Sequence, residues 1–407
     1  MKILLTLPGP LFPPDTGGKI RSLNIFSRLA KKAEIHAVSF AEPGDEAGVA
    51  EMKAIFAGYT PVFRTEAQKY SAAFYSELLV NQFSFWPYFL AKCNTPDFRR
   101  VVGALAVGKR FDLVFCDFLQ TAAPLRELTG QPKVVFEHNV EFLLRKRKWQ
   151  GEQRALRRWI YGAEWKKTRQ IEADVCRSFD HVIAVSDDDR QTLRREFGTT
   201  RSSAIPAGVD TDFFCPSTER PEPGRMVFVG SMDWDPNEDG AVWFLQEIYP
   251  RIRMSVPHAS FAVVGRAPSP RLRAIAEKMP GVEITGWVPD VRPHVAKAEV
   301  VLVPLRVGGG TRIKIPEAMA MAKAVVSTPI GAEGLPFRDG RHIRIAEQPD
   351  EFARAVVELV NNAGLRNSIA QAARDEVVNC HSWEPIVAKV EHILEQTMRQ
   401  SKRASAA

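Results

Sequence analysis

Short apolar runs alternate with amphipathic stretches along the whole chain. In the first half, runs rich in β-branched residues predict strands at Lys2–Leu7, Glu34–Phe40, Leu113–Cys116, Lys133–Glu137 and His181–Val185. In the second half, similar runs predict strands at Met226–Gly230, Ser260–Gly265, Val282–Gly286, Val300–Pro304 and Ala324–Thr328. Most of them precede a helix-type pattern, for example Arg21–Lys32, Asp188–Phe197, Ala241–Met254, Pro270–Lys278 and Lys314–Met321. Because strand–helix alternation builds parallel sheets through right-handed crossovers, the pattern predicts an α/β fold.

The number of strand–helix units predicts two domains. About ten units, in a chain of 407 residues, exceed what one doubly wound sheet holds comfortably. We therefore expect two Rossmann-like domains facing across a cleft. The polar, Pro-rich segment STERPEPGR marks a boundary, so we expect an N-terminal domain over 1–207, a linker over 208–224 and a C-terminal domain over 225–380. Residues 381–407 are expected to form a C-terminal helix, packed back on the first domain, and a frayed tail.

Composition is that of a globular protein outside the membrane. Hydrophobic residues make up 45% of the chain and charged residues 25%. No stretch reaches the roughly 18 uncharged apolar residues that span a bilayer. The N-terminal apolar run is stopped by Pro8 and predicts a buried strand instead of a signal peptide. Five scattered cysteines without a Cys-x-x-Cys pair argue against a disulfide framework or a zinc site. We expect a cytoplasmic protein.

A net charge of +7 favours an anionic partner, and much of the positive charge lies within Arg145–Arg169. Only two glutamates oppose the cations between these residues, and Trp149, Trp159 and Trp165 are interleaved with them. Two interpretations stay open. The segment contacts the anionic inner face of the cell membrane, or it is a solvated helix whose aromatic residues lie in the core. No nucleic-acid-reading motif accompanies it, so nucleic acid is not an expected partner.

The strongest candidate for chemistry is the glycine loop Val307–Thr311, which follows a predicted strand and leads into a helix. Successive glycines let backbone N–H groups approach an anion, and a helix N-terminus adds partial positive charge. Arg312 and Lys314 supply the full charges that a diphosphate needs. Glu317, about one turn further, can accept hydrogen bonds from ribose hydroxyls. The alternative is a flexible glycine loop before an ordinary amphipathic helix.

Three further candidates follow strands in the first half. Gly17 and Gly18 make a tight turn beside a bound phosphate or sugar, or serve only as a strand-to-helix connection. Asp117 ends one strand and His138 follows the next. His138 is a candidate for proton transfer or for binding a sugar hydroxyl, although a single histidine at a strand end is often only a satisfied polar residue.

Several segments, taken in order, resemble the GT-B glycosyltransferases, and glycosyltransferase family 4 in particular. They are PPDTGGKIRS, HVIAVSDDD, IPAGVDTDFF, FVGSMDWDPNEDG, FAVVGRAPS, ITGWVPDV and VVLVPLRVGGGTRIKIPEAMAMAKAVVSTPIGAEGL. The resemblance covers nearly the whole chain. The subset with PPD-x-G-x-K-x-R and Gly-Gly-x-R-x-K segments is similar to sugar transferases of bacterial exopolysaccharide and cell-surface assembly.

The resemblance implies a retaining transfer from a nucleotide sugar, without a catalytic metal or a cofactor. It places the acceptor on the N-terminal domain and the donor on the C-terminal domain. By matching position, Glu317 holds the ribose, Gly17 and Gly18 lie near the donor phosphates, and Trp287 and Val288 border the nucleobase. The full set of implied donor contacts is Gly17, Gly18, Ser231, Arg266, Trp287, Val288, Gly309, Gly310, Thr311, Arg312, Lys314 and Glu317.

Three positions depart from the family pattern. Gly309 replaces the first glutamate of the Glu-x7-Glu motif, which contacts the donor sugar. SMDWDPN stands where many members carry an Arg and Lys pair, so we infer that Arg312 and Lys314 bind the diphosphate instead. The histidine of many members aligns near Asp117, whereas His138 comes from the following strand. Either Asp117 or His138 is therefore the residue that orients the acceptor or stabilises developing positive charge.

The sequence thus predicts transfer of a sugar from a nucleotide donor to a saccharide or lipid-linked acceptor, in polysaccharide or glycoconjugate synthesis. Two alternatives stay open. One is another GT-B chemistry, sugar-nucleotide epimerisation or phosphorolysis. The other is a degenerate fold that acts as a membrane- or partner-binding subunit.

Overall fold

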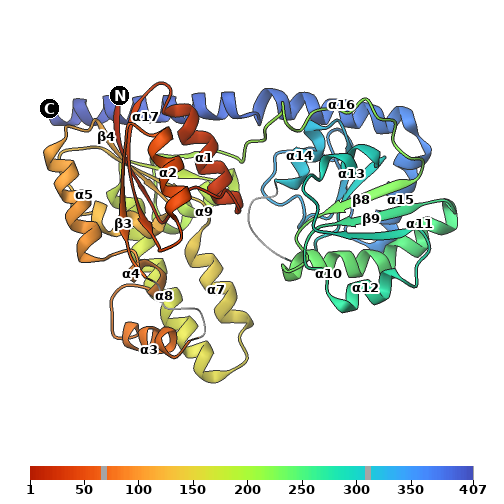
Figure 1. Ribbon diagram of the computed structural model, residues 1–407, viewed down its shortest axis with the longest axis horizontal. Helices are drawn as coiled ribbons and strands as arrows, with labels where there is room; N and C mark the ends of the chain where they lie inside the picture. Colours follow the sequence, from red (N-terminus) through yellow and green to blue (C-terminus); the bar gives the residue numbers. More distant parts are fainter. Residues whose placement is uncertain (66–70, 308–312, 407) are drawn as a thin grey trace. The chain divides into compact units, whose positions relative to one another are not determined.

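The chain forms two compact α/β units, described here from a computed structural model that covers residues 1–65, 71–307 and 313–406. Unit 1 comprises Met1–Pro206 and Val387–Ala407, and unit 2 comprises Ala207–Ile386 (Figure 1). Each unit carries one parallel sheet. The segment 208–224, expected as a linker, lies within unit 2.

Unit 1 is built on a seven-stranded sheet of order β3-β2-β1-β4-β5-β6-β7. The strands are β1 Lys2–Leu7, β2 Glu34–Ala41, β3 Gly58–Phe63, β4 Leu113–Asp117, β5 Lys133–Glu137, β6 His181–Ala184 and β7 Ser202–Ala204. The helices are α1 Gly17–Leu29, α2 Glu46–Ile55, α3 Ala72–Asn81, α4 Tyr88–Ala91, α5 Pro96–Gly108, η1 Leu119–Thr121, α6 Ala122–Leu125, α7 Glu141–Gly151, α8 Ala155–Ser178 and α9 Asp187–Phe197. All described strand pairs are parallel.

Unit 2 is built on a six-stranded sheet of order β10-β9-β8-β11-β12-β13. Its strands are β8 Arg225–Val229, β9 Ser260–Val264, β10 Val282–Gly286, β11 Val300–Val303, β12 Ala324–Ser327 and β13 Arg344–Ile345. Its helices are α10 Asp235–Trp243, η2 Phe244–Ile248, α11 Tyr249–Ser255, α12 Pro270–Ala276, α13 Arg292–Lys297, α14 Lys314–Ala320, α15 Pro349–Asn361 and α16 Ala363–Cys380. The last helix, α17 Trp383–Ala406, begins in unit 2 and continues in unit 1 from Val387.

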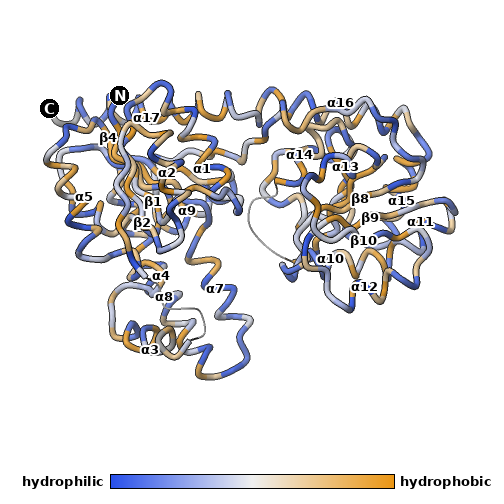
Figure 2. Tube along the Cα trace, in the orientation of Figure 1, coloured by the Kyte–Doolittle hydropathy of each residue, from blue (hydrophilic) through white to orange (hydrophobic). Residues whose placement is uncertain are grey.

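The central strands are mostly apolar because helices cover both faces of each sheet. Every residue of β4 and of β11 is buried. Figure 2 shows these hydrophobic strands at the centre of each unit. Both sheets therefore have the continuous cores expected of doubly wound folds, as the strand–helix pattern predicted.

The strand order places a crevice at one position in each sheet. In unit 1 the chain builds outward from β1 to β3 and then returns to β4 on the other side of β1. In unit 2 it builds from β8 to β10 and returns to β11 beside β8. At such a switch point the loops after neighbouring strands diverge and leave a crevice at the carboxyl ends, where ligands of open α/β sheets bind.

The structure adds three strands that the sequence pattern did not predict: β3, β7 and β13. Residues of β3 are mostly half-buried and include Pro61, whereas β7 and β13 have three and two residues. Such short or half-exposed edge strands lack the apolar run that marks a central strand. At the other end of the chain, residues from Lys402 to Ala406, expected as a tail, continue α17.

The basic segment from Arg145 to Arg169 is two helices, α7 and α8, instead of one long helix. Glu152–Arg154 separates them, and α8 packs along α7 because a three-residue connection makes antiparallel neighbours. The rings of Trp149 and Trp165 stack between the two helices, 4.9 Å apart. Two of the interleaved tryptophans thus pack against each other. The helices extend away from the sheet beside α3 (Figure 1).

Candidate functional site

Two of the predicted residues of unit 1 lie in direct contact at the end of β4. Asp117 is the last residue of β4 and is fully buried. His138 follows β5 and donates a hydrogen bond from Nε2 to Asp117 Oδ1, at 2.8 Å. Ser22 of α1 donates from Oγ to the other carboxylate oxygen, Oδ2, at 2.6 Å. Gly18, Ser22, Asp117, Phe118 and His138 are named the Asp117 cluster below.

The Asp117 contact fixes the proton and the orientation of the His138 ring. A carboxylate only accepts, so the proton lies on Nε2 and the neutral ring presents a lone pair at Nδ1. Nδ1 is buried and has no hydrogen-bond partner in the described part of the chain. Burial lowers the pKa of His138, and the nearby Asp117 opposes the shift. The ring is therefore neutral near pH 7, and its buried Nδ1 can accept one hydrogen bond.

Phe118 covers one face of that imidazole. The two ring centroids lie 3.7 Å apart, with the planes inclined by 12°. The backbone of Phe118 has a φ of 67°, a conformation that is rare for a residue with a side chain. It is held there by the turn from β4 into η1, and the Phe118 N–H donates to the carbonyl oxygen of Phe136. Positive-φ residues of this kind cost roughly 1–3 kcal/mol and occur often at functional sites.

The glycine turn near the N-terminus meets the same cluster. Thr16 caps α1 by accepting from the N–H of Lys19, which starts the helix at Gly17. A Cβ added at Gly18 would lie 2.7 Å from Cζ of Phe118 and 3.8 Å from Nδ1 of His138. Only glycine permits this approach, so the turn lies against the free face of the cluster. We infer that Nδ1 of His138 faces the Gly17–Gly18 turn.

A buried arginine adjoins the cluster. Arg21 of α1 is 1% exposed, and its Cζ lies 5.8 Å from the ring centroid of Phe136. Burial lowers the pKa of Arg21 to about 10, against the raising effects of Asp117 and Asp189. Arg21 thus stays cationic at neutral pH and adds positive potential to the crevice at the end of β4.

Behind His138 lies a group of buried carboxyls. Glu172 of α8 accepts from the backbone N–H groups of Glu141 and Phe142, at 2.9 and 2.7 Å, and so caps the start of α7. Glu137 is 1% exposed, and neither of its carboxyl oxygens has a hydrogen-bond partner among the described residues. Burial raises the pKa of Glu137 and of Glu172 well above the usual range, and Glu141 raises both further. Glu137 is therefore best described as a neutral acid.

In unit 2 the ammonium group of Lys314 lies at the carboxyl end of β8. Lys314 is the first residue of α14, and its Nζ donates to Asn237 Oδ1 at 2.8 Å. Asn237 in turn donates from Nδ2 to the carbonyl oxygen of Ser231, at 2.8 Å. Nζ also lies 4.6 Å from the ring centroid of Phe228, a residue of β8. A cation thus occupies the strand end where SMDWDPN stands in place of a basic pair.

Glycines allow this close approach. A Cβ at Gly230 would lie 2.9 Å from Lys314 Nζ and 2.8 Å from the side chain of Asn237. At Gly265 it would lie within bonding range of the carbonyl of Gly230. The loops that follow β8 and β9 therefore pack backbone against backbone at Gly265, which must be glycine, whereas a side chain at Gly230 would displace the ends of Asn237 and Lys314.

Ser231 and Arg266, predicted donor contacts, lie together on these two loops. Nε of Arg266 donates to Ser231 Oγ at 2.8 Å and pairs with Asp233 Oδ2 at 3.2 Å. The guanidinium is largely exposed, so this ion pair is weak and can be exchanged for a ligand anion.

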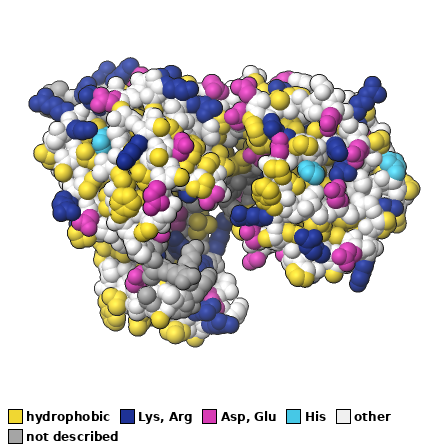
Figure 3. Space-filling view, in the orientation of Figure 1, with side chains coloured by type: hydrophobic (Ala, Val, Ile, Leu, Met, Phe, Trp, Pro, Cys, Tyr) yellow, Lys and Arg dark blue, Asp and Glu magenta, His cyan; other side chains and the backbone are white. Residues whose placement is uncertain are grey.

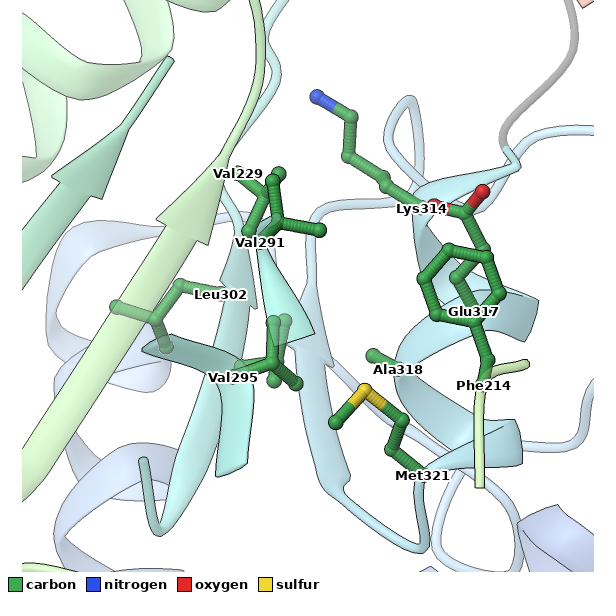
Figure 4. Close-up of a pocket in the computed structure, with 10 residues that line it drawn as sticks. Phe214, Val229, Val291, Val295, Leu302, Lys314, Glu317, Ala318 and Met321 are labelled. Atoms are coloured by element: carbon green, nitrogen blue, oxygen red, sulfur yellow. The ribbon is translucent and has the colours of Figure 1, made fainter. Parts of the chain in front are cut away.

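Glu317 lies one turn into α14, at the edge of a pocket with a cavity volume of about 10 Å³. Figure 4 shows Lys314 and Glu317 above its apolar walls. Burial raises the pKa of Glu317 to about 7, and Lys314 opposes the shift. The pocket is lined by Phe214, Val229, Val291, Val295, Val301, Leu302, Lys314, Glu317, Ala318 and Met321.

The remaining predicted donor contacts either have no described contact with Lys314 or Glu317 or lie outside the described residues. Trp287 follows β10 and is 72% exposed, whereas Val288 packs partly buried against the core. Gly309, Gly310, Thr311 and Arg312 fall within 308–312, outside the described residues. In the described part of the chain, no helix has the length and apolar character needed to cross a bilayer.

Sequence reasoning missed three residues of these sites: Ser22, Phe118 and Asn237. Ser22 and Phe118 contact Asp117 and His138, and Asn237 holds Lys314. A weak signal existed for one of them, because Phe118 directly follows a buried strand-end aspartate. Asn237 ends the segment SMDWDPN, of which the sequence pointed only to Ser231 as a donor contact.

Two family models match consecutive parts of the chain. Residues 25–213 match the family described as Glycosyltransferase Family 4. Residues 223–362 match the family described as Glycosyl transferases group 1. Together the two matches extend over most of units 1 and 2.

Two curated relatives are similar over part of the chain. An uncharacterized 44.6 kDa protein in the cps region of Klebsiella pneumoniae is 23% identical over an alignment of 281 residues, which covers 65% of this chain and 70% of the relative. A phosphatidyl-myo-inositol mannosyltransferase of Mycobacterium tuberculosis is 28% identical over 226 residues. That match spans 52% of this chain and 58% of the mannosyltransferase, less than two thirds of its length.

Solved structures with the same fold cover nearly the whole chain. Sucrose-phosphate synthase from Thermosynechococcus elongatus aligns with a TM-score of 0.69 and 15% identity, over 98% of this chain and all of that one. HepE from Anabaena in complex with UDP aligns with a TM-score of 0.66 and 14% identity, over 97% of this chain and all of that one. At these identities the likeness concerns the fold, two Rossmann-like α/β domains of the GT-B type.

Proposed function

The chain belongs to the GT-B glycosyltransferases, and we propose that it is a retaining, metal-independent enzyme that moves a sugar from a nucleotide-sugar donor to a saccharide or lipid-linked acceptor. A role in polysaccharide or glycoconjugate synthesis is supported by two relatives: an uncharacterized protein of a cps region and a phosphatidyl-myo-inositol mannosyltransferase. A nucleotide-sugar donor is further supported by the structural neighbour that binds UDP.

One observation carries the donor assignment. The ammonium group of Lys314 lies beside Gly230 and Asn237, at the switch-point end of β8, where glycines allow a diphosphate to approach the backbone. We propose that Lys314 and Arg312 bind the diphosphate and stabilise its charge as it leaves. Glu317 then accepts hydrogen bonds from the ribose hydroxyls, and the GWVPD segment with Trp287 and Val288 borders the base.

In unit 1, the Asp117 cluster supplies the contact to the reacting sugars. Asp117 holds the proton on Nε2, so Nδ1 of His138 accepts a hydrogen bond from a sugar hydroxyl at the Gly17–Gly18 turn. Both residues thus take part, Asp117 as the orienting group and His138 as the contacting group. In the reaction, the bond from the anomeric carbon to the diphosphate breaks and the acceptor oxygen bonds to that carbon. The acceptor proton passes to the departing phosphate.

Donor binding is the first test. Calorimetry with a panel of nucleotide sugars should find one that binds, and Lys314→Ala and Arg312→Ala should each weaken it by about tenfold or more. Lys278→Ala, which removes an exposed cation of the same unit, is the matched control and should bind as the unaltered protein does. If the Arg312 and Lys314 double variant kept full affinity and turnover, the diphosphate assignment would be wrong.

Turnover then separates transfer from the other GT-B chemistries. Donor incubated alone should stay intact, because an epimerase or a hydrolase needs no acceptor. With lipid-linked or saccharide acceptors, the product should keep the anomeric configuration of the donor by NMR. A chelator should leave the rate unchanged if the protein cations replace a metal.

A further inference from the structure

The last turn of α3 and the residues that follow it expose large apolar side chains to solvent. Phe83 is 92% exposed, Val80 71%, Leu79 62% and Phe85 52%. Leu79, Val80 and Phe83 lie at helical spacing on one side of the chain, because the N–H of Phe83 bonds the carbonyl oxygen of Val80. Single exposed apolar residues are ordinary, but four within seven residues form a patch that calls for a partner. Residues Leu79–Phe85 are named the apolar turn.

The apolar turn is fixed in place from beneath by α8. Nζ of Lys167 donates to the carbonyl oxygens of Asn81 and Gln82, at 2.8 and 3.1 Å. Glu164 accepts from the N–H of Tyr88 at 2.7 Å, and Asn81 is buried beside it. The carbonyl oxygens of Asn81 and Gln82 and the Asn81 side chain thus bond inward to α8, while the apolar side chains are exposed to water. An unsupported loop would bury those side chains instead, so the outward arrangement is built by specific contacts.

The same helix carries an uncompensated positive charge. Exposed residues on α7, α8 and their connection include Arg147, Lys148, Arg154, Arg157, Arg158 and Lys166. Of the three glutamates between Glu141 and Arg169, Glu141 and Glu164 are buried. Glu152 alone of these is not buried. Leu156 and Trp159 are exposed among them, at 71% and 61%. Residues Arg147–Trp159 are named the basic hairpin.

The apolar turn and the basic hairpin lie on one lobe of unit 1. Glu164 and Lys167, which hold the turn, are 9 and 12 residues beyond the start of α8, a rise of roughly 14–18 Å along the helix. Figure 3 shows hydrophobic side chains at the end of this lobe with Lys and Arg beside them. Both parts therefore belong to the same lobe, connected by α8.

We propose that the apolar turn and the basic hairpin together dock unit 1 on an anionic phospholipid bilayer. Phe83, Phe85 and their neighbours enter the interfacial layer, and the arginines and lysines of the hairpin contact lipid phosphates. Trp159 has an apolar body and a polar N–H, which suits the headgroup layer. Trp149 and Trp165 take no part, because they stack on each other.

A second copy of the chain fits this surface poorly. In a twofold dimer the same patch faces itself, so the basic hairpins would be brought together with only one glutamate each, Glu152, to oppose their cations. A bilayer of anionic lipid offers an apolar layer for the exposed hydrophobic side chains and negatively charged headgroups for the cations. The proposal does not depend on the reaction proposed above, because docking needs neither donor nor acceptor.

Vesicle flotation of the full chain tests the proposal. The unaltered protein should float with phosphatidylcholine vesicles that contain phosphatidylglycerol. It should bind vesicles of phosphatidylcholine alone at least about tenfold more weakly. Phe83→Ser with Phe85→Ser should reduce binding to the anionic vesicles about tenfold or more. Val107→Ser, at a site 90% exposed on α5, is the matched control and should bind normally.

The charge is tested separately. Arg154, Arg157 and Arg158 changed together to Gln should abolish the preference for anionic vesicles, and binding of the unaltered protein should weaken as salt is raised. Changing Arg194, Arg195 and Arg201 removes the same charge from exposed positions elsewhere in unit 1 and should leave binding intact.

Three results would overturn the proposal. The unaltered protein could fail to float with any vesicle. The Phe83 and Phe85 variant could keep full binding. Size-exclusion chromatography could instead show a dimer that the apolar-turn variant converts to a monomer, which would assign the surface to a second copy. Donor affinity, measured in the same preparations without lipid, distinguishes these results from failure of the proposed reaction.

Discussion

The ring of Phe118 lies flat on the imidazole of His138, with centroids 3.7 Å apart, while the backbone of Phe118 has a φ of 67°. The stack fixes the plane of His138, and Asp117 fixes its rotation through Nε2. Among the described residues nothing bonds the other ring nitrogen, Nδ1, whose lone pair is thus held in one direction. An imidazole held in this way needs little reorganisation when a sugar hydroxyl arrives.

The first prediction concerns the contact between Gly18 and Phe118. Gly18→Ala adds a methyl group 2.7 Å from the Phe118 ring, so we expect destabilisation by roughly 1–3 kcal/mol in thermal or urea unfolding. In a Phe118→Ala background the same change should cost much less, since the obstructing ring is gone. Gly103→Ala is the control: nothing lies within 4 Å of its added methyl group, and a helical alanine should be neutral or stabilising. Equal costs in both backgrounds would contradict the close approach.

The second prediction concerns the pairing of Asp117 with His138. Asp117→Asn preserves the shape but offers an amide in place of the carboxylate, so the His138 ring loses its fixed tautomer. We expect turnover to fall by roughly a hundredfold with little change in unfolding temperature. Ser22→Ala removes only the second hydrogen bond to Asp117 and should cost far less activity. Equal losses in the two variants would show that the carboxylate acts only through packing.

The third prediction concerns Glu317. Burial raises its pKa to about 7, so the fraction of charged carboxylate in the unliganded protein grows as pH rises through that value. Affinity for the nucleotide sugar should therefore strengthen several-fold between about pH 6 and pH 8, because the carboxylate is the better acceptor for ribose hydroxyls. Glu317→Gln should flatten this dependence, and Glu277→Gln, at an exposed position, should keep it. A pH-independent affinity in the unaltered protein would argue against a ribose contact.

The fourth prediction concerns the neutral acid Glu137. Its pKa in the folded state is raised by burial, whereas the unfolded value stays near 4.5. Below the unfolded pKa both states hold the proton. Above it the unfolded state releases the proton more readily, so stability is lost as pH rises toward the folded pKa. Glu137→Gln does not titrate and should be more stable than the unaltered protein by about 1–3 kcal/mol at neutral pH, with the gain vanishing near pH 4.

Unfolding temperatures at the two pH values measure that gain. Glu51→Gln, an exposed glutamate of α2, is the control and should show no such pH-dependent gain. A stabilisation by Glu137→Gln that is the same at both pH values would reveal a packing effect unrelated to the proton.

The sequence by itself determined the strands and helices that build the two sheets. Apolar runs such as Val300–Val303 are buried on both faces. A strand buried in this way has consecutive apolar residues, which can be recognised in the sequence. Strand-end residues such as Asp117 were also predictable, because the carboxyl ends of parallel strands carry the ligands of this fold. Edge strands such as β3 could not be predicted, because they are half-exposed and lack a run of consecutive apolar residues.

The tertiary structure decided which of these residues meet. Ser22 and Asp117 are 95 positions apart, and Asn237 and Lys314 are 77 apart, yet each pair shares a hydrogen bond. Such contacts depend on strand order and on glycines that let loops approach, neither of which is a local property of the chain. The same holds for the apolar turn. Its residues are as apolar as those of a buried segment, and only the tertiary structure shows that they face water.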